Sequence, residues 1–353
     1  MVRVGLLVEQ NWNAVPGGTA RSANRLAKAL AAYTSVEVVG VHGVHGAKPT
    51  LALPDGLETV QIPMPGRPLT ESWSRFDRPS LDRWLEVDVV HAPAYVLPPT
   101  KAPRVATIHD LAFVRHPEWF TPNGVEYFTR FLRRVEQSDT VVIVPSQATA
   151  DDCAARGIDE SRIHTIGWGV DVAVATADQV ADVTKRYGLP EDFVLFVGTL
   201  EPRKNVAALI DAMAHLPASS LVVVGPAGWG EIDLGGATVL GDVPDGDVEP
   251  LMAAAAVLVY PSHFEGFGLP VLEAMAQGTP VVTTQNTAPA ELVEDAGIAV
   301  DTHSPIAIAE AVEGLLDSPS QRAELGERGR TRAATFRWDE TARAHAAIYE
   351  DMS

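Results

Sequence analysis

Short apolar runs alternate with amphipathic stretches along the whole chain. Such runs, bounded by turn residues, are typical of buried parallel strands, and stretches with apolar residues at helical spacing are typical of surface helices. In the first half the predicted strands are residues 2–8, 36–41, 59–62, 87–91, 105–109, 140–144 and 162–166. The predicted helices there are residues 21–33, 125–137 and 147–156. Ser146 stands directly before the last helix, where an N-cap belongs.

A second set of elements repeats this alternation. Its predicted strands are residues 193–197, 221–224, 239–240, 257–260, 280–283 and 298–300, and its helices include 206–216 and 271–277. Residues 167–188 lack a strong apolar period, which predicts a linker. Residues 338–352 form an amphipathic pattern, and we expect this last helix to pack back across both domains.

This pattern predicts an α/β fold of two Rossmann-like, doubly wound domains with parallel sheets. A chain of 353 residues suits two such cores better than one. We place the domains at residues 1–170 and 171–335, followed by the C-terminal helix at 336–353. Doubly wound sheets bind ligands at the carboxyl ends of their strands, so we expect a ligand cleft between the two domains.

Charge is unevenly distributed and narrows the choice of partners. The formal net charge is −19, and residues 1–150 hold 15 Lys and Arg against 14 Asp and Glu. The rest of the chain holds 12 basic and 32 acidic residues, which argues against a nucleic-acid partner. An anionic ligand of that half therefore needs a local cluster of cations.

The cellular compartment is indicated by features that the sequence lacks. Cys153 is the single cysteine, so neither an internal disulfide nor a cysteine metal cluster is expected. No apolar run approaches the roughly 18 to 20 residues of a membrane span, and residues 1–9 predict a strand rather than a signal peptide. We expect a cytoplasmic protein. Three arginines of one helix, Arg130, Arg133 and Arg134, indicate either a weak contact with the inner face of the cell membrane or a solvated helix face.

The most informative stretch, residues 262–275, follows the strand that ends at residue 260 and opens a helix. Gly266 and Gly268 let the backbone approach a ligand, and the N–H groups of a helix start attract anions. Glu265 and Glu273 stand eight positions apart around this turn. Two carboxylates beside an anion site suit the binding of sugar hydroxyls, although a plain Gly-Pro turn with a first-turn glutamate explains the pattern equally well.

A cation pair follows another strand of the same half. Arg203 and Lys204 lie in Gly-Thr-Leu-Glu-Pro-Arg-Lys-Asn, residues 198–205, directly after the strand at 193–197. Arginine can bind a phosphate bidentately and lysine adds a point charge. Cations at a helix start oppose the helix dipole unless an anion lies between, which favours a binding role over a solvated turn.

Weaker signals stand elsewhere. Gly17 and Gly18 follow the first strand and could approach a phosphate, but they do not form the G-x-G-x-x-G of dinucleotide-binding proteins. Asp245-Gly246-Asp247 imitates a metal-binding D-x-D motif, and we interpret it as a turn and cap preceding a helix. No metal site is expected.

Taken in order, these segments resemble the retaining family 4 glycosyltransferases of GT-B fold. The resemblance rests on residues 198–205 and on the E-x7-E of Glu265 and Glu273. Residues 107–113, which contain His109, and residues 116–120, which contain Trp119, resemble the branch with many mannosyltransferases. One departure concerns Thr199, where some relatives carry an arginine that contacts the diphosphate.

The resemblance implies roles for the matching residues. Arg203 and Lys204 would neutralise the donor diphosphate, Glu273 would hold the nucleotide ribose, and Glu265 would bind hydroxyls of the transferred sugar. The remaining implied donor contacts are Gly17, Gly18, Val243, Phe267, Gly268 and Leu269. His109 would line the sugar and acceptor side. The loops at residues 225–229 and 241–243 would lie near the nucleoside.

The implied reaction moves a hexose, with mannose from GDP-mannose favoured over UDP-sugars, to a hydroxyl of a glycan or lipid-linked sugar acceptor. It needs no cofactor, because fixed cations and a helix start can stabilise the departing nucleoside diphosphate. Two alternatives remain at this point. One is a sugar-nucleotide epimerase of the same fold, and the other is a non-catalytic subunit that binds a nucleotide sugar.

Overall fold

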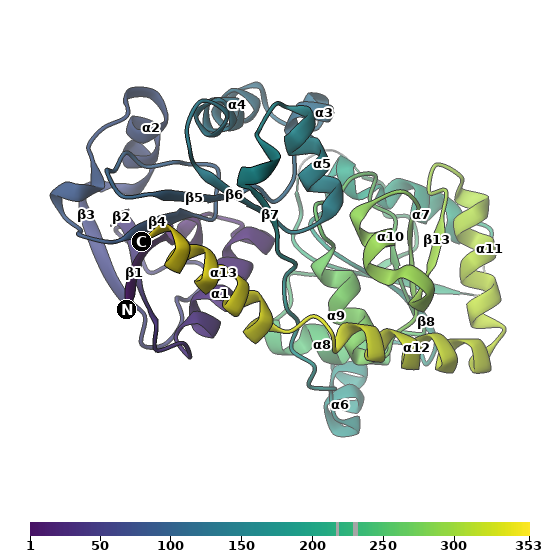
Figure 1. Cartoon of the computed structure of the whole chain (residues 1–353). Coiled ribbons are helices and arrows are strands. Elements are labelled where there is room, and N and C mark those ends of the chain that lie inside the picture. The colour runs from purple at the N-terminus through teal and green to yellow at the C-terminus, as the bar shows by residue number, and fades with distance from the viewer. Residues whose placement is uncertain (217–218, 229–231) are drawn as a thin grey trace. The chain divides into compact units, whose positions relative to one another are not determined.

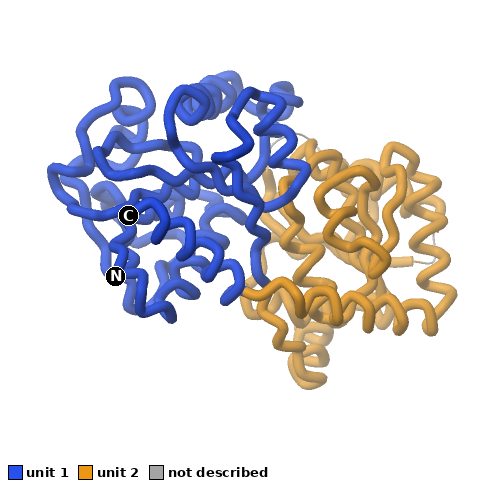
Figure 2. Tube along the Cα trace, viewed as in Figure 1, with its two compact units in different colours: residues 1–169, 338–353 blue, residues 170–337 orange. Residues whose placement is uncertain are grey.

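The computed structural model describes residues 1–216, 219–228 and 232–353, which divide into two compact units. Unit 1 contains Met1–Gly169 and Trp338–Ser353, and unit 2 contains Val170–Arg337 (Figure 2). Both are built around a parallel sheet, so the predicted pair of Rossmann-like α/β domains is confirmed.

Unit 1 holds a seven-stranded sheet in the order β3-β2-β1-β4-β5-β6-β7. Its strands are β1 Val2–Leu7, β2 Val36–Val44, β3 Glu58–Pro65, β4 Val89–Ala92, β5 Arg104–Thr107, β6 Val141–Val144 and β7 Ile163–Thr165. Its helices are α1 Gly17–Leu30, α2 Gly66–Phe76, α3 Ala112–Arg115, α4 Pro122–Glu136, α5 Gln147–Ala155 and α13 Trp338–Met352. Short 3-10 turns are η1 Glu9–Trp12, η2 Leu81–Arg83, η3 Pro117–Trp119 and η4 Glu160–Arg162.

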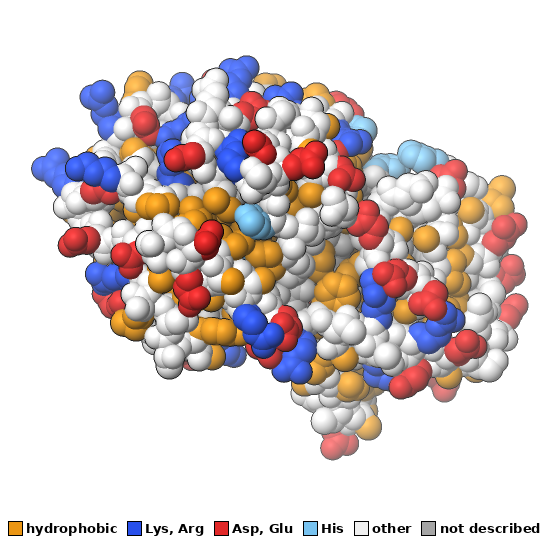
Figure 3. Space-filling model, viewed as in Figure 1, with side chains coloured by type: hydrophobic (Ala, Val, Ile, Leu, Met, Phe, Trp, Pro, Cys, Tyr) orange, Lys and Arg blue, Asp and Glu red, His pale blue; other side chains and the backbone are white. Residues whose placement is uncertain are grey.

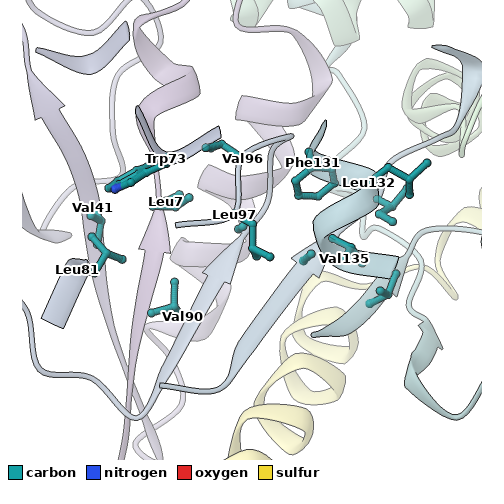
Figure 4. Packing of buried hydrophobic residues seen from close by; sticks show 14 of the residues in the cluster. Leu7, Val41, Trp73, Leu81, Val90, Val96, Leu97, Phe131, Leu132 and Val135 are labelled. Carbon is teal, nitrogen blue, oxygen red and sulfur yellow. The ribbon is translucent and has the colours of Figure 1, made fainter. Parts of the chain in front are cut away.

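Helices cover both faces of this sheet: α4 and α5 lie above it in Figure 1, and α1 and α13 below. The upper core packs Trp73 of α2 and Phe131 of α4 against strand residues such as Val41 and Val90 (Figure 4). On the other face, Tyr349 of α13 belongs to a separate buried cluster. Because both faces are buried, the strands read as continuous apolar runs rather than alternating ones.

Unit 2 holds a six-stranded sheet in the order β10-β9-β8-β11-β12-β13. Its strands are β8 Phe193–Val197, β9 Ser220–Val224, β10 Thr238–Gly241, β11 Val257–Tyr260, β12 Val281–Thr284 and β13 Ile298–Val300. Its helices are α6 Ala177–Tyr187, α7 Val206–Met213, α8 Asp245–Ala254, α9 Leu269–Gln277, α10 Ala288–Val293, α11 Pro305–Leu316 and α12 Pro319–Ala333. Short 3-10 turns are η5 Pro202–Lys204 and η6 Glu294–Ala296.

The prediction of a plain linker at residues 167–188 was wrong, because this segment contains α6. The Thr176 side chain accepts a hydrogen bond from the backbone N–H of Gln179, and Gln179 Oε1 accepts one from the backbone N–H of Thr176. Gly188 ends the helix in the left-handed region. Val180, Val183 and Tyr187 stand at helical spacing along it, but Val183 is its one buried residue. Polar caps rather than a buried face define it.

Candidate functional site

A cluster of charged side chains lies at the carboxyl edge of the sheet in unit 2. It is formed by the loop that follows β8 and the loop that follows β11, and these two strands are hydrogen-bonded neighbours. From β8 the sheet extends through β9 and β10 on one side, and from β11 it extends through β12 and β13 on the other. The strand order therefore reverses between β8 and β11. In doubly wound sheets ligands bind at this reversal point.

Backbone contacts tie the two loops together. The Arg203 carbonyl accepts a hydrogen bond from the backbone N–H of His263 at 2.9 Å. Asn205 adopts a left-handed conformation with φ of 53°, and its side-chain amide donates to the carbonyls of Pro261 and Thr302. Asparagine tolerates this conformation better than most residues. The turn that carries both cations is therefore fixed against the β11 loop.

Lys204 is buried within this cluster, with 8% of its surface exposed. Its ammonium donates to Glu265 Oε1 at 2.6 Å and to the Tyr260 hydroxyl at 2.5 Å. The same ammonium lies 4.8 Å from the centre of the Tyr260 ring. A buried lysine needs such partners, because an unpaired buried charge is strongly unfavourable.

Arg203 is held on two edges of its guanidinium. Nη1 contacts Glu265 Oε2 at 2.9 Å and donates to the carbonyl of Phe264 at 2.9 Å. Nε and Nη2 both donate to Glu201 Oε1, at 3.1 and 2.7 Å. Glu265 thus bridges the two cations, and the structure brings Arg203, Lys204 and Glu265 together in one cluster, in which Lys204 is buried and the other two are half-buried.

The cluster holds two positive charges, on Arg203 and Lys204, and two negative charges, on Glu201 and Glu265. These neighbouring charges and burial shift the pKa values of its groups. Burial alone would raise the pKa of Glu265, but the Arg203 and Lys204 charges hold it at about 2. Burial lowers the pKa of Lys204, which the Glu265 carboxylate opposes. Burial also raises the pKa of Tyr260 well above its ordinary value, so its phenol keeps its proton. A diphosphate brought to these cations would compete with the carboxylates.

The glycine turn before α9 has the conformation that its sequence suggests. Gly268 has φ of 105° and forms the N-cap, and Pro270 stands in the first turn of the helix. A Cβ on Gly268 would lie 3.0 Å from Pro289, at the start of α10. The close approach of α10 and the positive φ both require glycine. Phe267 is buried beside this turn, and Leu269 begins α9.

Glu273 lies on α9, four residues after Leu269, and is half-buried. Val243 lies between β10 and α8 and is buried. The loops after β8, β9 and β10 are joined along one edge, since Gly198 donates to Val224 and Gly225 donates to Gly241. The predicted nucleoside loop therefore borders the cation loop, although its Trp229 lies outside the described residues.

The predicted site residues of unit 1 also follow strand ends. Gly17, with φ of 64°, and Gly18 open α1 after β1. His109 follows β5, and its Nε2 donates to the Pro93 carbonyl at 2.8 Å. Its ring stacks on Trp168 at 5.7 Å between centroids. Burial lowers the pKa of His109, which keeps the imidazole neutral at physiological pH.

The Asp-Gly-Asp segment has a structural role. It forms the first turn of α8 rather than a turn before it, which corrects the predicted placement, and Pro244 is the N-cap. Asp247 accepts hydrogen bonds from Arg186, at 2.7 and 2.9 Å, and from the Tyr187 hydroxyl at 2.6 Å. These contacts join α8 to α6. Within the described parts of the chain no group of three or more His, Cys, Asp or Glu side chains could hold a metal ion.

Two of the three arginines on α4 have intramolecular partners. Arg130 pairs with Glu126 and donates to Ser74, and Arg134 pairs with Asp77, while Arg133 is exposed. Figure 3 shows basic and acidic side chains interspersed over the displayed face of unit 1. No helix among residues 1–216, 219–228 and 232–353 is long and apolar enough to cross a membrane.

Sequence reasoning missed two members of the cluster, Glu201 and Tyr260. Glu201 lies within residues 198–205 and Tyr260 lies just before residues 262–275, yet neither residue type by itself signals a role there. Glu201 directly precedes the Pro-Arg-Lys turn, and Tyr260 is the last residue of an apolar strand. Only their contacts with Arg203 and Lys204 assign them to the site.

Two family models match the chain, one in each unit. Residues 16–174 match Glycosyltransferase Family 4, and residues 184–332 match Glycosyl transferases group 1. The chain is similar to O-antigen chain mannosyltransferase B of Escherichia coli, with 32% identity over 71% of each chain. It is also 32% identical to D-inositol 3-phosphate glycosyltransferase 2 of Catenulispora acidiphila, over 70% of this chain and 65% of that enzyme. It thus spans just under two thirds of the length of that second relative.

The fold is shared with solved structures. HepE of Anabaena, solved in complex with UDP-glucose, superposes with a TM-score of 0.77 and 18% identity, over 99% of this chain and 100% of the other. At this identity the likeness concerns the fold, which is the GT-B fold. Because the matched models and relatives are transferases, neither an epimerase nor a non-catalytic binding subunit is favoured.

Proposed function

Since the chain belongs to the glycosyltransferases of GT-B fold, we propose that it moves a hexose from a nucleoside diphosphate sugar to a glycan or glycolipid hydroxyl. The anomeric configuration is retained, and the donor is GDP-mannose. The activity needs no metal. The protein acts in the cytoplasm, with a weak contact to the inner face of the cell membrane.

The cluster of Arg203, Lys204 and Glu265 carries this proposal. Departure of a nucleoside diphosphate places growing negative charge on its phosphates, and preorganised cations stabilise that charge without reorganising during the reaction. Lys204 and Arg203 are preorganised by hydrogen bonds to the Glu265 carboxylate at 2.6 and 2.9 Å. Glu265 also provides an acceptor for hydroxyls of the transferred sugar.

The reaction itself is a substitution at the anomeric carbon. The bond between that carbon and the diphosphate oxygen breaks, and a bond to the acceptor oxygen forms on the same face. The acceptor proton passes to a donor phosphate oxygen, and the nucleoside diphosphate leaves with the bonding electrons. Arg203 and Lys204 stabilise its charge, and the start of α9 at Phe267, Gly268 and Leu269 adds backbone N–H groups.

The remaining roles follow the family resemblance. Glu273 holds the ribose, and Val243 lies near the nucleoside. Gly17 and Gly18 contact the diphosphate, and His109 contacts the sugar or the acceptor. Since burial lowers its pKa, His109 would act as a neutral hydrogen-bonding group rather than as a cation.

Mannose is favoured because the Escherichia coli relative is a mannosyltransferase and because the His109 and Trp119 segments resemble that branch. The shared fold with HepE, solved with UDP-glucose, keeps a UDP-sugar as the second candidate. The two candidates differ in the base of the nucleotide, guanine or uracil, so the nucleotide that binds distinguishes them.

A thermal-shift panel with GDP, UDP and ADP, each with and without EDTA, tests the donor. A ligand at 100 times its dissociation constant stabilises the fold by about 2.7 kcal/mol. We expect GDP to raise the melting temperature and EDTA to leave the shift unchanged. A shift with UDP alone would replace GDP-mannose by a UDP-sugar. No shift with any nucleotide would overturn the proposed donor class.

Product analysis with GDP-mannose and a glycolipid extract then tests the reaction. A new glycoside whose anomeric configuration matches that of the donor supports the proposal. An isomerised nucleotide sugar without acceptor consumption would instead indicate the epimerase.

A further inference from the structure

We infer that Glu201 and Tyr260 are positioning residues of the donor site: Glu201 fixes the guanidinium of Arg203, and Tyr260 fixes the ammonium of Lys204. The family resemblance assigns neither residue a role: Glu201 lies within residues 198–205 beside the Arg-Lys pair, and Tyr260 ends the strand before residues 262–275. This inference rests on the proposed function, because it assumes that the two cations bind a diphosphate.

Glu201 is placed to set the plane of the Arg203 guanidinium. It is 5% exposed, and its Oε1 accepts hydrogen bonds from Nε and Nη2 on one edge. On another edge Nη1 is held by the Phe264 carbonyl and by Glu265. A guanidinium fixed in this way presents its planar donors in one orientation, as bidentate phosphate binding requires. Part of the entropic cost of ordering the arginine is thereby met before a ligand arrives.

Tyr260 is placed to set the position of the Lys204 ammonium. Its hydroxyl accepts a hydrogen bond from Nζ at 2.5 Å and donates one to Glu265 Oε1 at 3.1 Å. Its ring lies beneath Nζ and stacks on Phe196 of β8 at 6.5 Å between centroids. Tyr260 ends β11, so two neighbouring strands hold this ring. A flexible lysine is thus bound to a rigid part of the sheet.

An effect of charge alone and a positioning role predict opposite changes in nucleotide affinity when the Glu201 carboxylate is removed. Removing its carboxylate takes a negative charge from beside the phosphate site, and Coulomb attraction would then favour tighter binding of an anionic nucleotide. Loss of orientation of Arg203 would weaken the same binding. The sign of the change in nucleotide affinity therefore separates the two explanations.

The test uses the full chain and the nucleoside diphosphate, GDP, UDP or ADP, that binds the wild type most tightly. Calorimetry gives its dissociation constant, and steady-state assays with the matching sugar nucleotide give kcat and KM. We expect Glu201→Leu to raise the dissociation constant about tenfold, and Glu201→Gln, which keeps an acceptor oxygen, to restore most of the affinity. We expect Tyr260→Phe to lower kcat about tenfold, with KM changed by less than about threefold.

Matched controls change similar groups away from the cluster. Tyr349→Phe removes a buried hydroxyl that contacts His91 Nδ1 at 2.7 Å, and Asp152→Asn neutralises a buried carboxylate that pairs with Arg115. Both should lower thermal stability and leave nucleotide affinity unchanged. The inference is overturned if Glu201→Leu binds the nucleotide as tightly as the wild type or more tightly, or if Tyr260→Phe retains wild-type kcat. If the wild type binds no nucleotide and transfers no sugar, the proposed function fails, and this inference fails with it.

Discussion

Lys204 and Glu265 form an ion pair shielded from solvent, with Nζ and Oε1 2.6 Å apart, although they stand 61 positions apart along the chain. The pair exists because β8 and β11 are neighbours in the sheet, although β9 and β10 lie between them in the sequence. Taking two charges out of water is costly, so such a pair is maintained only where its geometry and further hydrogen bonds compensate. Arg203 and Tyr260 provide those bonds, and Glu201 holds Arg203 in place.

Replacing Lys204 should slow the transfer step more than it destabilises the donor complex. Removal of one preorganised charge contact typically raises a barrier by about 2.7 to 4 kcal/mol, so Lys204→Ala should lower kcat roughly a hundredfold or more. Initial rates with saturating sugar nucleotide measure this. Lys185→Ala, which changes an exposed lysine at the end of α6, should keep wild-type rates. Wild-type turnover in Lys204→Ala would remove Lys204 from the mechanism.

Stability should depend on the protonation of Glu265 in acid. Its pKa of about 2 in the folded chain lies below the ordinary 4.5, so its stabilising contribution is complete above about pH 5 and is lost as pH falls toward 2. Glu265→Gln removes the carboxylate that bridges Lys204 and Arg203, leaving Arg203 paired with Glu201, and should cost about 3 to 5 kcal/mol at pH 7. Urea unfolding at pH 7 and pH 3.5 should show the gap between wild type and variant narrowing in acid. A gap of equal size at both values would contradict the assigned ion pair.

A second acid effect should come from unit 1, through His345 of α13. Burial lowers the pKa of His345 from 6.5 to about 4, so the unfolded chain binds the proton more readily between these values. The free energy of unfolding should therefore decrease as the pH is lowered from 6.5 to about 4, by up to about 1.4 kcal/mol per pH unit for this group. In urea unfolding at pH 7 and pH 5, His345→Leu should show a shallower loss. His215→Leu, at an exposed histidine, should reproduce the wild-type slope.

The turn before α9 should not tolerate a side chain at Gly268. Its φ of 105° and the 3.0 Å distance from a built Cβ to Pro289 oppose any substitution. Gly268→Ala should cost about 1 to 3 kcal/mol in the unfolding free energy and weaken nucleotide binding. Gly246→Ala is the control, because a Cβ there meets nothing within 4 Å. Thermal melts with and without the nucleotide measure both effects, and equal behaviour of the two variants would refute the strain argument.

Much of the fold could be predicted from the pattern of residues. The strand at 193–197 and the final helix at 338–352 were placed at their observed ends, because each apolar run or period ends at polar or turn-forming neighbours. The helix α6 was missed because it buries little, and α2 was not identified. Buried Leu69 and Trp73 of α2 stand one turn apart, a short signal within eleven residues.

The sequence by itself determined the class of the fold and the residues Arg203, Lys204 and Glu265, because local propensity, apolar period and motif spacing are written along the chain. The tertiary structure alone decided how these charges pair. Strand order brings the β8 and β11 loops together, and burial then requires each charge to find partners that no local pattern specifies, which is how Glu201 and Tyr260 enter the site.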